Sequence, residues 1–457
     1  EKMGSTQWLE EGRRLRMTPL VEHEKVMRHL RPVLEILADE FPVEGPRARA
    51  LTAYLERKPR ALDYAKFRAK HDLSGQSWHL WEKSSYPEEG SAAIATQERR
   101  RLIWQFWAEE QVSELAIRAG ATGGPGLYLD LPIGVHGDGF DVYRFGYVFA
   151  PKTSAGAPPD SFFTRGQDWG FPPPHPWRQR EDGYAYLREV LEHHMRLAGL
   201  LRIDHVMGLH RLYWVPWGMG AKQGAYIRYP YEELYALYCL LSVRHGCSLA
   251  GEDLGTVPPA VRPEMQAHGI HRLFVGQFSF RDGTPAMDQP PKGSIASLNT
   301  HDLPTFCGFW LGADIDDRFD LGLIEPNVAA KERLERQKLR CQVLDGLGLS
   351  PGAESRLAAH SNPEIAEMDW TLEVDPFRVL VQLTVILEKS EAEAVLVNAE
   401  DLWKSMDPQN VPGTWKERPN WQRKARFGLA DWSRLNEIKT ALEALRNEFW
   451  GESKPLK

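Results

Sequence analysis

The stretch LLRIDHVMG at residues 200–208 decides the fold, together with YPYEELYALYCLLSVRHG at 229–246 and SLAGEDLG at 248–255. The first and third stretches are short and mostly apolar, which is typical of buried strands. In the stretch between them, apolar residues recur three and four positions apart, which indicates a helix. Strand, helix and strand in this order predict two parallel strands joined by a crossover helix.

The same alternation continues on both sides of this unit. Strand candidates, including the two above, lie at 127–135, 200–208, 248–255, 272–280, 294–302 and 392–402. A helical pattern at 184–199 precedes the second of them, and two or more helices are expected between about 326 and 390. Carboxylates and histidines gather at the carboxyl ends of the strands, where barrel active sites lie. We therefore predict an α/β fold with a parallel sheet and helices outside it, of the TIM-barrel type.

The domain organisation follows from the same reading. Helical patterns dominate up to residue 118, so we expect an α-helical lead-in at 1–118 and the barrel portion at 119–457, with a helical segment near 313–390. Residues 150–178 are rich in Pro and Gly, and we expect no regular structure there. Because this stretch also carries aromatic and polar side chains, we interpret it as a substrate-binding loop that could act as a lid.

Composition narrows the functional class. The 457 residues are 42% hydrophobic and 26% charged, which is the balance of a globular protein. The net charge of −7 gives no basic field for nucleic acid or an acidic membrane, and no run of about 18 apolar residues suggests a membrane span. The four cysteines form no CxxC pair, so we expect neither disulfides nor a zinc site. With no signal peptide visible at Glu1, a cytoplasmic location is expected.

Three strand ends carry residues suited to chemistry. Arg202 and Asp204 are two positions apart, so they point to the same side of a strand, and an arginine favours the ionised form of a neighbouring carboxylate. Glu252 ends the next strand, where a partly apolar pocket would keep it protonated. His301 and Asp302 follow a third strand and could stabilise a positive charge.

Each of these features alone is more often a structural salt bridge. Taken together and in order, they match the needs of glycoside chemistry, which uses one carboxylate to attack the sugar carbon and one carboxylic acid to protonate the leaving oxygen. Negative charge near the oxocarbenium-like transition state completes the set.

Longer motifs surround these residues and resemble one enzyme family. They are DLPIGVHGDGFDV (130–142), FFTRGQDWGFPP (162–173), LRIDHVMGLHRLYWVPWG (201–218), GEDLGTVPPAV (251–261), LNTHDLPTF (298–306) and NVPGTWKERPNW (410–421). In this order they resemble the amylomaltases, the 4-alpha-glucanotransferases also called disproportionating enzymes, over about residues 106–425. The resemblance implies a (β/α)8 barrel of the alpha-amylase clan that transfers alpha-1,4-glucan segments between maltodextrins, by retaining double displacement and without a cofactor or metal.

The resemblance also implies roles for single residues. Asp204 matches the nucleophile, Glu252 the acid/base and Asp302 the carboxylate that stabilises the transition state. Arg202 and His301 would hold the sugar at the cleaved bond. Further glucan contacts are implied for Asp138, Gln167, Trp169, Phe278 and Asn410. Other interpretations stay open for three of these: Trp169 as a loop anchor, Phe278 as a core ring and Asn410 as a turn cap.

The chain departs from the family in one respect. The family's first two barrel strands should precede the helical lead-in, and we do not find them, so we expect an N-terminally truncated chain that is inactive alone. Rival hypotheses are a maltodextrin-binding fragment without catalysis and an alpha-glucan hydrolase of the same clan. A metal hydrolase using His136, Asp138, His205 and His301 fits no metal-ligand spacing, and the glycines at 120–126 lack the lysine of a phosphate-binding loop. The oligomeric state is left open.

Overall fold

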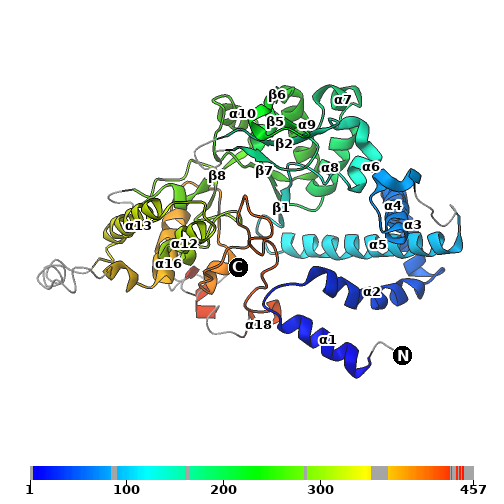
Figure 1. Cartoon of the computed structure of the whole chain (residues 1–457), viewed down its shortest axis with the longest axis horizontal. Helices are drawn as coiled ribbons and strands as arrows, with labels where there is room; N and C mark the ends of the chain where they lie inside the picture. Colours follow the sequence, from blue (N-terminus) through cyan, green and yellow to red (C-terminus); the bar gives the residue numbers. More distant parts are fainter. Residues whose placement is uncertain are drawn as a thin grey trace, which may run out of the picture. The chain divides into compact units, whose positions relative to one another are not determined.

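The structure, a computed structural model, divides the chain into two compact units. It describes residues 4–83, 90–159, 165–281, 286–350, 369–432, 434, 439–440, 442–443 and 445–446. Unit 1 comprises Glu1–Leu15 and Glu24–Ile270, and unit 2 comprises Arg16–His23 and His271–Lys457 (Figure 1).

The first part of unit 1 is helical, as the apolar spacing predicts. Its helices are α1 (Thr6–Met17), α2 (His23–Asp39), α3 (Pro46–Arg57), α4 (Arg60–Ser74), η1 (Trp78–Lys83) and α5 (Ala92–Gly120). A buried cluster that includes Phe41, Tyr54, Ile103 and Phe106 joins α2, α3, α4 and α5. The Ser91 side chain caps α5 by accepting the Ile94 N–H at 3.4 Å, which satisfies one of the donors left free at a helix start. The end of α5 leads into the first strand of unit 1 (Figure 1).

Unit 1 holds three parallel strands at predicted positions. They are β1 (Tyr128–Leu131), β4 (Leu200–Ile203) and β7 (Ser248–Gly251), with β4 in the middle. The register sets Asp130 opposite Arg202 and Ile203 opposite Gly251. Each observed strand is shorter than the predicted one, so Asp204 and Glu252 lie directly after their strands.

The apolar face of these strands packs against helices. The helices of this part are α6 (Phe140–Phe145), η2 (Gly146–Val148), α7 (Pro176–Glu181), α8 (Ala185–Met195), η3 (Val206–Leu209), η4 (Ala221–Gln223), α9 (Tyr231–His245) and α10 (Val261–Ala267). Leu201 and Ile203 of β4 belong to one buried cluster with Leu191 and Met195 of α8 and Leu241 of α9. Side chains alternate along a strand, so Arg202 points to the opposite face, where the polar groups gather.

A second, antiparallel sheet in unit 1 corrects the expectation for residues 150–178. It comprises, in spatial order, β3 (Gln167–Asp168), β2 (Thr153–Ala157), β5 (Arg211–Pro216) and β6 (Ala225–Arg228). The small residues of β2 gain their hydrogen-bonding partner from β5, about sixty residues further on, which local sequence patterns do not reveal. At Gly156 an added Cβ would lie 2.1 Å from the Gln167 carbonyl oxygen, so only glycine allows β3 to approach.

Unit 2 holds three more parallel strands at predicted positions. They are β8 (His271–Val275), β9 (Ile295–Ser297) and β10 (Ala394–Leu396), with β9 in the middle. The helices are η5 (Gly276–Phe278), α11 (Phe306–Leu311), α12 (Ala313–Asp320), α13 (Pro326–Gly346), η6 (Trp370–Leu372), α16 (Pro376–Glu388), α17 (Ala399–Leu402) and α18 (Leu429–Trp432). The strand predicted at 392–402 is wrong in its second half, which forms α17. Phe306, Trp310, Leu344 and Leu383 lie in the core of this unit.

Within the described ranges, no helix is long and apolar enough to cross a membrane.

Candidate active site

A buried arginine links two carboxylates on neighbouring strands of unit 1. The Arg202 Nη2 lies 2.9 Å from Asp204 Oδ1, and its Nη1 donates to both carboxylate oxygens of Asp130 at 2.8 and 2.7 Å. Burial would lower the pKa of Arg202, but Asp204, Asp130 and Glu252 outweigh it and raise the pKa. Arg202 is therefore permanently charged beside Asp204. A carboxylate nucleophile must be ionised, and a neighbouring cation favours that form.

Glu252 lies at the end of the adjacent strand in a different environment. Burial raises its pKa to about 7, against the lowering effect of Arg202, and Asp204 adds to the rise. The Glu252 carboxylate accepts the His205 N–H at 2.9 Å and the Leu254 N–H at 3.0 Å, and both bonds oppose the rise. A carboxyl group that titrates near neutral pH suits a general acid/base.

Backbone hydrogen bonds hold the two strand ends together. The Glu252 N–H donates to the Ile203 carbonyl and the Val206 N–H donates to the Glu252 carbonyl, each at 3.0 Å. The structure thus brings Arg202, Asp204 and Glu252 into one cluster. It adds Asp130, which the sequence reading missed as a partner because it lies 72 residues from Arg202.

In unit 2, Asp302 forms a second polar cluster. The His301 Nε2 lies 3.3 Å from Asp302 Oδ2, and the Asn410 Nδ2 donates to Asp302 Oδ1 at 2.7 Å. The His301 ring lies 5.6 Å from the ring of Trp421. Asn410 therefore does more than cap a turn, because it fixes the orientation of the Asp302 carboxylate.

The loop that carries His301 and Asp302 is anchored to a buried carboxylate, Asp401. Asp401 accepts the Asn299 Nδ2–H at 3.1 Å and the Phe306 N–H at 2.7 Å. Burial raises the pKa of Asp401 to about 6. The Thr305 hydroxyl also donates to the Ser405 carbonyl at 2.6 Å. The sequence reading missed this anchor, since an aspartate near a strand end is its only local signal.

Two further predicted glucan contacts, Gln167 and Trp169, lie next to the cluster of unit 1. The Trp169 Nε1–H donates to Gln167 Oε1 at 3.1 Å. The Trp169 ring stacks on Phe171 at 6.0 Å and meets the His205 ring edge to face at 5.5 Å. His205 directly follows Asp204, so this aromatic group adjoins the candidate nucleophile.

The other two predicted contacts are in different surroundings. Asp138 accepts the Ser77 hydroxyl at 2.6 Å, and its own N–H donates to His136 Nδ1 at 3.1 Å. Phe278, in unit 2, is 65% exposed, so the structure rules out the core-ring interpretation. Among the residues that the structure describes, no three His, Cys, Asp or Glu side chains are grouped to hold a metal ion.

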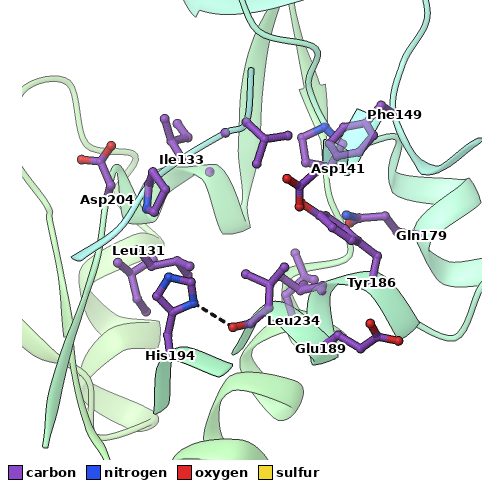
Figure 2. A pocket seen from close by; sticks show the side chains of 18 of the residues that line it. Leu131, Ile133, Asp141, Phe149, Gln179, Tyr186, Glu189, His194, Asp204 and Leu234 are labelled. Atoms are coloured by element: carbon purple, nitrogen blue, oxygen red, sulfur yellow. Dashed lines mark hydrogen bonds between the residues drawn. The ribbon is translucent and has the colours of Figure 1, made fainter. Parts of the chain in front are cut away.

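A cavity of about 450 Å³ lies behind the strand ends of unit 1. Figure 2 shows it between the apolar side chains of Leu131, Ile133 and Leu234 and the polar groups of Tyr186 and its neighbours. Asp204 is at its edge, with the carboxylate directed away from the hollow (Figure 2). The cavity therefore does not present a sugar to the candidate nucleophile.

Comparisons with known proteins point to one family. A family model described as 4-alpha-glucanotransferase matches residues 2–430. A 4-alpha-glucanotransferase of Mycobacterium tuberculosis is 32% identical over 84% of this chain and 53% of its own length. One of Haemophilus influenzae is 34% identical over 72% of this chain and 46% of its own length. The chain thus spans about half the length of these curated relatives.

Solved structures show the same fold. The amylomaltase of Corynebacterium glutamicum superposes with a TM-score of 0.80 at 25% identity, over 96% of this chain and 62% of its own. The amylomaltase of Streptococcus agalactiae in complex with acarbose superposes with a TM-score of 0.71 at 19% identity, over 94% of this chain and 80% of its own. The predicted fold class, an α/β barrel of the TIM type, is confirmed. The match over residues 2–430 shows that the chain belongs to the 4-alpha-glucanotransferase family.

Proposed function

We propose that this protein acts as a 4-alpha-glucanotransferase on maltodextrins, with Asp204 as nucleophile and Glu252 as acid/base. One observation carries the proposal. On two adjacent strand ends, one carboxylate lies 2.9 Å from a buried arginine, and the other has its pKa raised to about 7. Such a pair, one group ionised and the other able to hold a proton, is what glycoside chemistry requires.

In the first half-reaction, Asp204 attacks the anomeric carbon of the donor glucan. The bond from this carbon to the glycosidic oxygen breaks, and Glu252 gives its proton to that oxygen as the reducing-side fragment leaves. The non-reducing part of the glucan stays on Asp204 as an ester. Arg202 stays charged throughout and faces the carboxylate before and after attack.

In the second half-reaction, Glu252 is ionised and takes the proton from the 4-hydroxyl of an acceptor glucan. The hydroxyl oxygen attacks the anomeric carbon and Asp204 leaves, which regenerates both carboxyl groups. Two inversions give net retention. Asp302, oriented by Asn410 and His301, supplies the negative charge that favours the oxocarbenium-like transition state in this proposal.

Maltodextrins are the proposed substrates because the aromatic ring of Trp169 and the amide of Gln167 lie beside the strand end that carries Asp204 and His205, and because further aromatic rings are exposed. The stacked Trp169 and Phe171 rings and the exposed Phe278 ring offer flat surfaces for sugar rings. Glucan contacts of Gln167, Asp138 and Asn410 are part of the same proposal. A cytoplasmic location stays a prediction from the sequence.

Incubation with pure maltotriose tests the proposal. Transfer yields longer maltodextrins together with free glucose, whereas hydrolysis yields glucose and maltose with no longer chains. Absence of products, both from this chain and from a version extended by the two N-terminal strands that the family resemblance implies, combined with measurable maltodextrin binding, would identify a binding protein. D204N serves as the control, because it removes the nucleophile with little change in shape.

A further inference from the structure

His205, which separates Asp204 from η3, has a left-handed backbone conformation that residues other than glycine adopt uncommonly. Its φ is 48° and its ψ is 63°, in the left-handed region that glycine and asparagine enter most readily. Histidine in this region is strained, and such strain persists only where the surroundings enforce it.

The conformation has a specific consequence for Glu252. It turns the chain directly after β4, so that the His205 N–H donates to Glu252 Oε2 at 2.9 Å. The next N–H, of Val206, donates to the Glu252 carbonyl at 3.0 Å. Residues 205 and 206 therefore hold Glu252 by its side chain and by its backbone.

The His205 ring has a contact that can enforce the conformation. It meets the Trp169 ring edge to face at 5.5 Å. Trp169 is itself held, because its N–H donates to the Ala155 carbonyl at 2.9 Å and its Nε1–H donates to Gln167. Burial, with help from Arg211, lowers the pKa of His205 to about 4, so the ring is neutral near pH 7. It acts through packing and not through charge.

We propose that His205 is a positioning residue for the acid/base: the contact of its ring with Trp169 keeps residue 205 left-handed and so directs its N–H at Glu252. The inference rests on the role proposed for Glu252 and deepens it. It links the antiparallel sheet, which carries the proposed glucan contacts, to the group that transfers the proton.

The charged groups near Glu252 are unchanged when residue 205 is substituted. From β4 and the residue after it, Arg202 and Asp204 face Glu252. On its own strand end, Asp253 is buried and paired with Arg262 at 2.8 Å. Replacing the neutral His205 ring leaves all these charges in place, so a change in Glu252 titration reports the hydrogen bond.

A comparison of H205A, H205G and H205N tests the proposal. All three lack the imidazole, but Gly and Asn accept a positive φ and Ala does not. A hydrogen bond to the carboxylate favours its charged form, so its loss in H205A should raise the Glu252 midpoint by roughly half a unit to one unit. H205G and H205N should keep the wild-type midpoint.

The midpoint is measured by ¹³C NMR of the glutamate carboxyl signals without glucan, and E252Q identifies the signal. This titration needs no activity, so it separates the inference from the proposed function, which the maltotriose assay decides. The alkaline limb of the transfer rate should move with the midpoint. An unmoved midpoint in H205A, or equal shifts in H205A and H205G, would overturn the proposal.

A second experiment tests the proposal even if H205A does not fold. W169L removes the ring contact from the other side, and it should raise the Glu252 midpoint in the same direction. In the H205G background W169L should add nothing, because no ring is left to hold. A further shift in that background would show that Trp169 acts on Glu252 by another path.

Discussion

At the residue scale, Arg202 is shared between two carboxylates, and this defines the chemistry of its neighbours. Its Nη1 donates to both carboxylate oxygens of Asp130, and its Nη2 lies beside Asp204 Oδ1, so one cation serves both carboxylates. The β1–β4 register enforces the sharing, because Asp130 lies directly opposite Arg202. The arginine is thus positioned by the sheet, and Asp204 is positioned by the arginine.

The first prediction concerns Asp204. D204N removes an attacking group that acts mainly in the transition state, so turnover should fall by several orders of magnitude, while maltodextrin affinity is largely kept. Transfer rates on maltotriose and binding by calorimetry measure the two effects. Near-normal turnover in D204N would contradict the nucleophile assignment.

The second prediction concerns stability and pH at Glu252. Burial, opposed by Arg202, raises its pKa from 4.5 to about 7, so the folded state holds a proton that the unfolded chain releases above pH 4.5. Stability from this group is complete below about pH 4.5 and is lost as pH rises to about 7. The amide side chain of E252Q cannot titrate. The unfolding free energy of E252Q relative to that of the wild type should therefore rise by about 1–3 kcal/mol from pH 5 to pH 8. Denaturant unfolding at both pH values measures this, and parallel stability curves would contradict it.

At the element scale, the antiparallel sheet of unit 1 depends on the close approach of β3 to β2 at Gly156. The carbonyl of Gln167 occupies the space that a Cβ would need, and Trp169 follows two residues later. The sheet therefore positions the proposed glucan contacts through a backbone contact that side chains cannot replace.

The third prediction follows from this contact. G156A should separate β3 from β2, lower the unfolding free energy by about 1–3 kcal/mol and raise KM for maltodextrins. G146A is the matched control, because nothing lies within 4 Å of its added Cβ and its φ is −51°. Equal behaviour of the two variants in thermal unfolding and kinetics would refute the assignment.

The fourth prediction concerns the loop between β9 and α11 in unit 2. D401A leaves the Asn299 amide and the Phe306 N–H without their buried acceptor, which costs about 1–3 kcal/mol. Because the same loop carries Asp302, the turnover of D401A should fall by more than the loss of folded protein explains. E391A, which removes an exposed carboxylate of the same unit, should leave both nearly unchanged. A D401A variant with wild-type turnover would show that the loop holds its shape without this anchor.

At the scale of the whole molecule, two units each have their own core, and each contains carboxylates for which we propose a catalytic role. Asp204 and Glu252 belong to unit 1, whereas Asp302 belongs to unit 2. Ligand binding is therefore a property to measure on the complete chain.

The fifth prediction uses that property. A maltodextrin that binds the folded chain should raise the thermal midpoint, since saturation at about 100 times Kd stabilises a protein by roughly 2.7 kcal/mol. Maltoheptaose should raise the midpoint in wild type and in D204N, while a beta-linked cello-oligosaccharide of equal length should not. Equal shifts by both sugars would indicate that binding does not recognise the alpha linkage.

The sequence alone determined the features that depend on neighbours along the chain. The strands carrying Asp204 and Glu252 were predictable because short apolar runs end in charged residues, and Arg202 was predictable as a partner because alternation puts i and i+2 on one face. The motifs from residue 130 to 421 indicated the family, and the comparisons confirm it.

Only the tertiary structure decided the contacts between distant residues. The pairing of Asp130 with Arg202 spans 72 residues, and that of Asn299 with Asp401 spans 102. The sheet that joins 153–157 to 211–216 was missed, since a small-residue strand shows its nature only beside its partner. The left-handed His205 was invisible as well, because its conformation comes from packing against Trp169 and not from its own preference. Local sequence patterns reflect the conformational preference of each residue, whereas tertiary contacts determine where a residue adopts a different conformation.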